Sequence, residues 1–133
     1  MRATLVMFAL VGCAASPSVP PGELPCGVSA VVCSRCVGCH DTRPQHGAHF
    51  SLRTWANVDG QFGSTDHRVW ERMQMVIEPG AIPHMPPMTS PDGQPTAAEL
   101  DTLRAWFEGG AVPAPIGSGC EDCRPPEDAS PAD

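Results

Sequence analysis

The stretch Cys36-Val37-Gly38-Cys39-His40 decides how this chain folds, because it places two cysteines two residues apart and a histidine directly after the second. At this spacing the two thiols can form thioethers to the two vinyl groups of one haem, and the imidazole can ligate the iron. One short segment thus fixes a porphyrin, its orientation and one axial ligand. We therefore expect a single covalent haem c held by Cys36, Cys39 and His40.

Three other interpretations of the cysteines compete with haem attachment. The pairs at residues 33–36 and 120–123 have the CxxC spacing of a four-thiolate zinc site. The cysteines of residues 33–39 repeat the first three of a ferredoxin-type iron–sulfur motif, but the fourth position falls on Arg43, which is not a ligand. A set of disulfides alone gives no reason for the position of His40.

The N-terminus predicts export. Arg2 precedes an apolar run over residues 5–11, which has the length and flanks of a signal peptide and is too short to span a bilayer. The run ends in Leu10-Val11-Gly12-Cys13, which looks like the lipobox of bacterial lipoproteins. An ordinary secretory signal, in which Cys13 merely follows a small residue, is the alternative.

The lipobox-like run predicts a membrane anchor. Residues 1–12 would be removed and Cys13 lipidated, and several acyl chains on one residue would hold the chain stably at a membrane. Residues 13–24 are rich in Ala, Ser, Pro and Gly and are expected to form a flexible tether. The expected location is the periplasmic side of a bacterial membrane, inner or outer.

The composition suits one small domain that needs help to form a core. The 133 residues include four Phe, three Trp and no Tyr, and a haem would add a large flat apolar surface for side chains to pack on. The formal net charge of −7 argues against nucleic acid as a partner. We expect one folded domain over residues 25–116, followed by an acidic, Pro-rich, Cys-containing tail over residues 117–133.

Helical spacing of apolar residues recurs in three stretches. The first runs into the haem motif. The second follows a capping candidate at Ser64 or Thr65 and stops at Pro79-Gly80, and the third begins at the capping box Thr96–Glu99 and stops at Gly109-Gly110. No strand pattern is visible, so the expected fold class is all-α. The apolar stripes are Val28, Val31, Val32 and Cys36; Val69, Trp70, Met73, Val76 and Ile77; and Leu100, Leu103, Trp106 and Phe107.

The order of these parts resembles class I cytochromes c over roughly residues 25–112. It is closer still to monohaem domains of large environmental bacteria, whose hallmarks are an MPP loop and a following helix that ends in Trp and Gly-Ala. Here these are Met85-Pro86-Pro87 and the run from Trp106 to Ala111. The resemblance implies about three main helices around one covalent haem c, with Met85 as the sixth iron ligand.

Chemistry independent of that resemblance supports a methionine ligand without fixing which one. A thioether is a soft, neutral ligand that raises the reduction potential of a haem, and flanking prolines stiffen the loop that presents it. Met88, also bracketed by proline, is the runner-up to Met85, and His84 would give bis-histidine ligation. Met73 is explained by helix packing. Three further histidines lie in polar surroundings and are expected to be solvent-exposed: His46, His49 and His67.

Four cysteines remain after the lipidation and haem candidates, and they allow three pairings. Related domains carry a cysteine just before the first helix and another after the last. This resemblance suggests that Cys26 bonds to Cys120 or Cys123 and that Cys33 takes the other. A small exposed loop closed by Cys120 and Cys123 is the alternative.

An iron bound by both His40 and Met85 has no position left for a substrate. The remaining chemistry is outer-sphere transfer of one electron, so we expect an electron carrier that exchanges electrons with redox protein partners, and not an enzyme. A haem enzyme or small-ligand sensor with an exchangeable sixth ligand is the alternative, for which His84 and Met88 offer competing ligands. A structural metal or disulfide module without haem is the third interpretation.

Overall fold

The computed structural model describes residues 21–120 and residue 123. The expected signal peptide, the lipidation candidate Cys13, most of the tether and most of the tail lie outside the described residues. The described part is helical, with two isolated bridges and no β-strand, so the expected all-α class is confirmed. The helices of this part are α1 (Cys26–Arg35), α2 (Trp55–Val58), α3 (Val69–Val76) and α4 (Ala97–Glu108).

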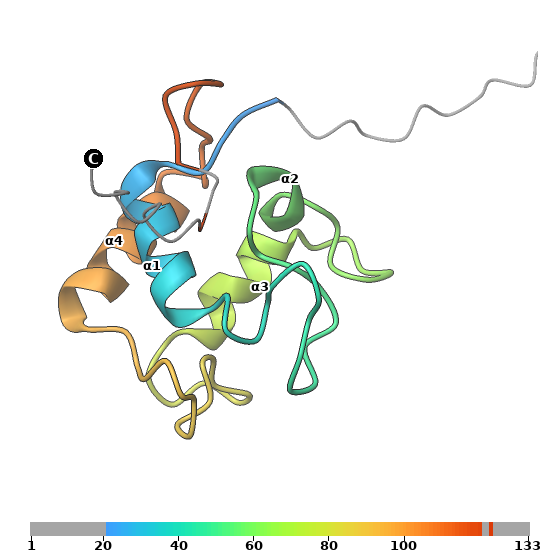
Figure 1. Ribbon diagram of the computed structural model, residues 1–133, viewed down its shortest axis with the longest axis vertical. Helices are drawn as coiled ribbons and strands as arrows, with labels where there is room; N and C mark the ends of the chain where they lie inside the picture. Colours follow the sequence, from blue (N-terminus) through green and yellow to red (C-terminus); the bar gives the residue numbers. More distant parts are fainter. Residues whose placement is uncertain (1–20, 121–122, 124–133) are drawn as a thin grey trace, which may run out of the picture.

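The first and last helices pack directly on each other, α3 packs on α4, and α2 packs on α3 (Figure 1). The apolar stripes predicted from the sequence supply much of this core, since Val28, Val31 and Val32 of α1 are buried together with Leu103 and Phe107 of α4. Burial of side chains of this size is worth roughly 1.5–3 kcal/mol each. Packing in this core therefore fixes the helices relative to one another. The loops between the helices lie outside the core.

Two helix boundaries differ from those expected. The first helix ends at Arg35, with Cys36 as its C-terminal cap, so the motif follows the helix. The capping candidates Ser64 and Thr65 are wrong, because the Thr65 hydroxyl donates to the carbonyl of Phe62 in a turn before the helix. The helix begins only at Val69.

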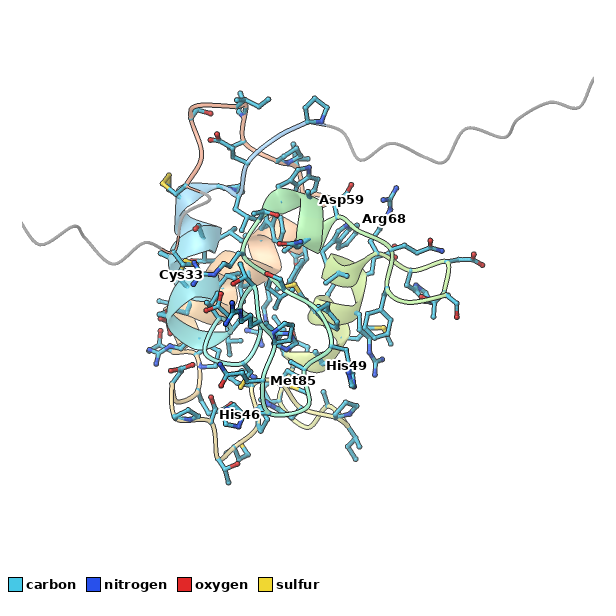
Figure 2. All side chains as sticks on the ribbon, turned by 45° about the vertical axis from the view of Figure 1, so that its right-hand side comes forward. Cys33, His46, His49, Asp59, Arg68 and Met85 are labelled. Atoms are coloured by element: carbon cyan, nitrogen blue, oxygen red, sulfur yellow. A yellow bond between two sulfur atoms is a disulfide. The ribbon has the colours of Figure 1, made fainter. Side chains whose placement is uncertain are left out.

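Arg68 precedes α3 and fixes its start. Its backbone N–H donates to the Glu71 carboxylate at 2.6 Å, which satisfies a donor that the helix leaves open. Its guanidinium donates to the Asp59 carbonyl at 2.6 Å and lies 3.6 Å from the Asp59 carboxylate (Figure 2). Asp59 is buried and follows α2 directly, so this pair ties the two short helices together.

The ends of α4 are those expected. The Thr96 hydroxyl accepts from the Glu99 backbone N–H at 3.3 Å, and the Glu99 carboxylate accepts from the Thr96 backbone N–H at 2.6 Å, which completes the capping box. Gly109 caps the C-terminus, and Gly110 has a φ of +83° that favours glycine.

Two disulfides clamp α1 to the chain after α4. Cys26, at the start of α1, bonds to Cys120, and Cys33, near its end, bonds to Cys123. This is one of the two connectivities that the family resemblance suggests, and the alternative bond between Cys120 and Cys123 is wrong. A zinc site that uses these cysteines is also excluded, because a disulfide sulfur is not a thiolate ligand.

The chain just before α1 is packed as well. Leu24 is fully buried, and its carbonyl accepts from the Cys120 backbone N–H at 2.9 Å. Glu23 exchanges two backbone hydrogen bonds of 2.9 Å with Ala114, and its carboxylate accepts from Gly119. The packed part of the chain thus begins before the residue at which the tether was expected to end.

Candidate functional site

An apolar cavity of about 290 Å³ lies between the haem motif, the loop that follows it, α3 and the MPP loop. The lining comes from two stretches of the chain, residues 35–52 and 62–87, which meet around the cavity because the two long loops return to the same end of the helices (Figure 1). Most of the lining is aliphatic or aromatic. The lining includes Cys36, Cys39, His40, Phe50, Leu52, Phe62, Val69, Met73, Val76, Ile77, Met85, Pro86 and Pro87, with four residues of basic type, Arg35, His46, His49 and Arg72, near them.

The motif turns sharply after α1 and brings both of its cysteines to the cavity. The backbone N–H groups of Cys39 and His40 donate to the Cys36 carbonyl at 3.2 and 2.9 Å, which forms one tight turn. Within the described part of the chain, Cys36 and Cys39 are the two cysteines outside a disulfide. The two thiols that the spacing assigns to haem attachment are therefore the two that the fold leaves available.

The imidazole of His40 is oriented by a hydrogen bond. Its Nδ1 lies 3.0 Å from the carbonyl oxygen of Phe50, and the Phe50 ring lies 4.8 Å from the imidazole. Because a carbonyl can only accept, Nδ1 carries a proton, and in the neutral imidazole the lone pair is then on Nε2. A hydrogen bond of this kind fixes the tautomer of a metal-ligating histidine and raises its basicity.

Met85 lines the cavity from the MPP loop (Figure 2). Its backbone N–H donates to the carbonyl of Val76, the last residue of α3, at 2.8 Å. The Gln94 side chain donates to the carbonyls of Pro86 and Pro87 at 3.1 and 2.9 Å, which ties the loop down further. Met85 is thus held by hydrogen bonds on both sides, with Pro86 buried beside it.

The other ligand candidates are placed differently. Met88 is 77 % exposed and does not line the cavity, and neither does His84, whose Nδ1 lies 3.1 Å from the Pro86 carbonyl. Met73 lines the cavity as part of the buried face of α3. Among the candidates from the MPP loop, only Met85 reaches the cavity in the described residues.

Two of the histidines expected to be exposed also lie at the cavity. His46 and His49 are exposed, yet both line the mouth beside Met85 (Figure 2). His46 and Gly47 have φ angles of +52° and +85°, so the loop turns tightly at these two residues, which both line the cavity. His67 is 66 % exposed at its side chain and lies away from the cavity, 3.5 Å from Glu71.

Burial at the cavity keeps the Cys36 thiol protonated. The pKa of Cys36 is raised to about 12, mainly because the thiol is removed from water. The nearby ionisable groups of Asp92, Cys39 and Glu99 raise it further, in that order. A thiol with this pKa carries almost no thiolate near neutral pH, so Cys36 is a poor metal ligand or nucleophile by itself. Within the described ranges, no group of three or more His, Cys, Asp or Glu residues could hold a metal ion.

The segment between the MPP loop and α4 closes over the motif. A Cβ added at Gly38 would collide with the carboxylate of Asp92, so glycine is the residue that fits there. Arg35 donates to the Asp92 carbonyl at 2.7 Å and to the Glu99 carboxylate at 3.1 Å. These contacts connect α1, the motif and the start of α4.

Glu99 makes this connection sensitive to acid. The backbone N–H of Thr96, and then the Arg35 guanidinium, hold the pKa of the Glu99 carboxyl below its ordinary value of 4.5. A lowered folded-state pKa stabilises the fold above pH 4.5, and this stabilisation is lost as the pH falls through the lower, folded-state pKa. We expect Glu99→Gln to cost about 0.5–1 kcal/mol of unfolding free energy at pH 7.

Urea unfolding of Glu99→Gln and the wild type at pH 7 and at pH 3 measures this effect. The gap between the two proteins should narrow in acid. A gap that is as large at pH 3 as at pH 7 would contradict the assignment of Glu99.

Several residues of the site were not found from the sequence. Phe50 and Phe62 meet edge to face with ring centroids 5.6 Å apart and line the cavity together. The only sequence signal for Phe50 and Phe62 was that each is an isolated aromatic residue in a polar loop. The positions of Arg72 and Asp92 depend on how the loops return, and no local pattern indicates them.

Comparisons with protein-family models, curated proteins and solved structures found no match to this chain. No described helix has the length and apolarity needed to cross a membrane. The apolar cavity nevertheless brings together groups that suit one ligand: two free thiols for covalent attachment, and an imidazole and a thioether that could bind a metal. This set fits a covalently attached haem.

Proposed function

We propose that this protein is a monohaem c-type cytochrome of class I type that carries one electron between redox partners. The observation that carries the proposal is that, among the described residues, the two cysteines outside the disulfides are those of the CxxCH motif, and that they share one apolar cavity with His40 and Met85. Cys36 and Cys39 would hold the haem by thioethers. His40 and Met85 would be the axial ligands of its iron.

A haem bound here supplies the one-electron couple of its iron. The chain contributes the rest. His40 and Met85 would both ligate its iron, which would leave no place for a substrate and would favour outer-sphere transfer. The apolar lining excludes water, and the hydrogen bonds to the His40 ring and the Met85 backbone hold both ligands in place. A thioether ligand also raises the reduction potential relative to a second histidine.

The proposal includes export and membrane attachment through Cys13, which lies outside the described residues. Haem c attachment and disulfide formation both suit a compartment outside the cytoplasm. The chain would then present its domain at the periplasmic face of a membrane, inner or outer.

Mass spectrometry of the exported full-length chain, produced with a c-type haem-attachment system, tests the proposal. The wild type should carry one haem on the peptide that contains residues 36–40, show a low-spin reduced spectrum, and offer no alkylatable thiol at Cys36 or Cys39. A Cys36→Ser/Cys39→Ser variant should carry none while keeping both disulfides. Absence of added haem in the wild type would overturn the proposal.

The alternative, a haem enzyme or sensor with an exchangeable sixth ligand, is favoured by one observation. His46 and His49 lie at the mouth of the cavity and could compete with Met85. Rapid binding of carbon monoxide to the reduced, undenatured protein would support the alternative over the electron carrier.

A further inference from the structure

Arg72, on α3, differs from the other cationic side chain that lines the cavity. Arg35 is neutralised by Glu99, to which its Nε donates at 3.1 Å, and it donates further to the Asp92 carbonyl. No side-chain hydrogen bond or ion pair of Arg72 is found among the described residues. The other arginines with carboxylate partners are Arg53 with Asp41, Arg68 with Asp59, and Arg104 with Glu78.

The surroundings of Arg72 call for an anion. It is half-buried, and it projects from the same helix as Val69, Met73 and Val76, which are buried and line the cavity with it. Within residues 21–120 and at residue 123, no aspartate or glutamate lines the cavity. A guanidinium in apolar surroundings is costly unless a negative group pairs with it, and its planar fork matches a carboxylate. A carboxylate on a ligand in the cavity would supply the partner that Arg72 lacks among the described residues.

We propose that Arg72 binds a carboxylate of the planar ligand that fills the cavity. Resting on the proposed function, this carboxylate is a propionate of the haem, and Arg72 keeps it ionised. The cysteines would hold the haem at its vinyl groups and Arg72 would hold one propionate, so the two contacts together would fix the orientation of the haem. A positive charge at this place also favours Fe(II) over Fe(III).

The midpoint potential of haem-loaded Arg72→Gln, measured from pH 5 to pH 9, tests this inference. At pH 8 the Fe(III)/Fe(II) ratio at a fixed potential should rise on the order of tenfold, because the removal of one positive charge at the cavity disfavours the reduced iron. Without its partner the propionate should also gain a higher pKa. The potential of the variant should then fall with rising pH more steeply than that of the wild type.

His46 and His49 line the same cavity as Arg72, so removal of this cation acts on them as well. The comparison of wild type and Arg72→Gln is therefore repeated in a His46→Gln/His49→Gln background, where a remaining difference between the two curves reports the propionate. Arg35 is already paired with Glu99. The matched control is Arg43→Gln, which removes the same charge from an exposed position outside the cavity and should leave the pH profile unchanged.

Arg72→Lys separates charge from packing. It keeps the cation, so it should retain a wild-type-like profile, and it should restore haem content if Arg72→Gln fails to mature. Equal profiles for Arg72→Gln and Arg43→Gln, or a lysine variant that behaves like the glutamine variant, would overturn the inference. A wild type without haem would instead refute the proposed function, so the two failures are distinguishable.

Discussion

Replacing Met85 by alanine is expected to lower the reduction potential of the haem-loaded protein by on the order of 0.1 V or more, within the span of about 0.8 V that axial ligands cover. The methionine-to-iron absorption should disappear at the same time. The reason is that Met85, unlike Met88 of the same loop, presents its thioether to the cavity. Loss of a soft, neutral sulfur ligand removes the preference of the iron for its reduced form. Spectroelectrochemistry measures both changes on one sample.

Met88→Ala is the matched control. Met88 lies three residues further along the same loop and is also bracketed by proline, but it is 77 % exposed and does not line the cavity. Its replacement should leave the potential and the spectrum unchanged. Were Met88→Ala to abolish the methionine band and Met85→Ala to retain it, the ligand assignment made from the cavity would be wrong.

The second large effect is the loss of unfolding free energy when the two disulfides are removed. Removal of both is expected to cost more than the sum of the two single removals. The bridges Cys26–Cys120 and Cys33–Cys123 join chain positions 94 and 90 residues apart. In the chain-entropy treatment, a single bridge over a loop of this length stabilises the fold by about 4.6 kcal/mol. Once one bridge is present, the second closes only the ring of roughly ten residues between the two bridges, worth about 2.7 kcal/mol.

Removal of either bridge alone should therefore cost about 2.7 kcal/mol, because the remaining one still restricts the long loop. Removal of both should cost about 7 kcal/mol, more than twice the single value. Urea unfolding of the haem-loaded protein, followed by far-ultraviolet circular dichroism, measures these values in paired Cys→Ser variants. Double-pair variants that lose only the sum of the two single losses would show that the bridges act independently in the unfolded chain.

Parts of the fold that depend on neighbouring residues were predictable. The capping box of Thr96 and Glu99 and the apolar stripe through Leu103 and Phe107 define α4 within twelve residues, and the structure agrees. Helix α2 was missed because four residues are too few for a periodic pattern, although Thr54 and Asn57 form a capping box around it. The start of α3 was misplaced because Thr65 makes a turn that resembles a cap in sequence.

The sequence by itself was enough to assign a role to the two cysteines and the histidine of the motif, because that assignment depends only on their spacing within five residues. The tertiary structure decided that Met85 and not Met88 faces the cavity, and which of the two suggested cysteine pairings forms across some ninety residues. It also decided that Arg72 pairs with no carboxylate of the described residues. These outcomes depend on where two long loops return after the helices have packed. Local sequence carries no information about that return, because burial of the shared core between α1, α3 and α4 sets it.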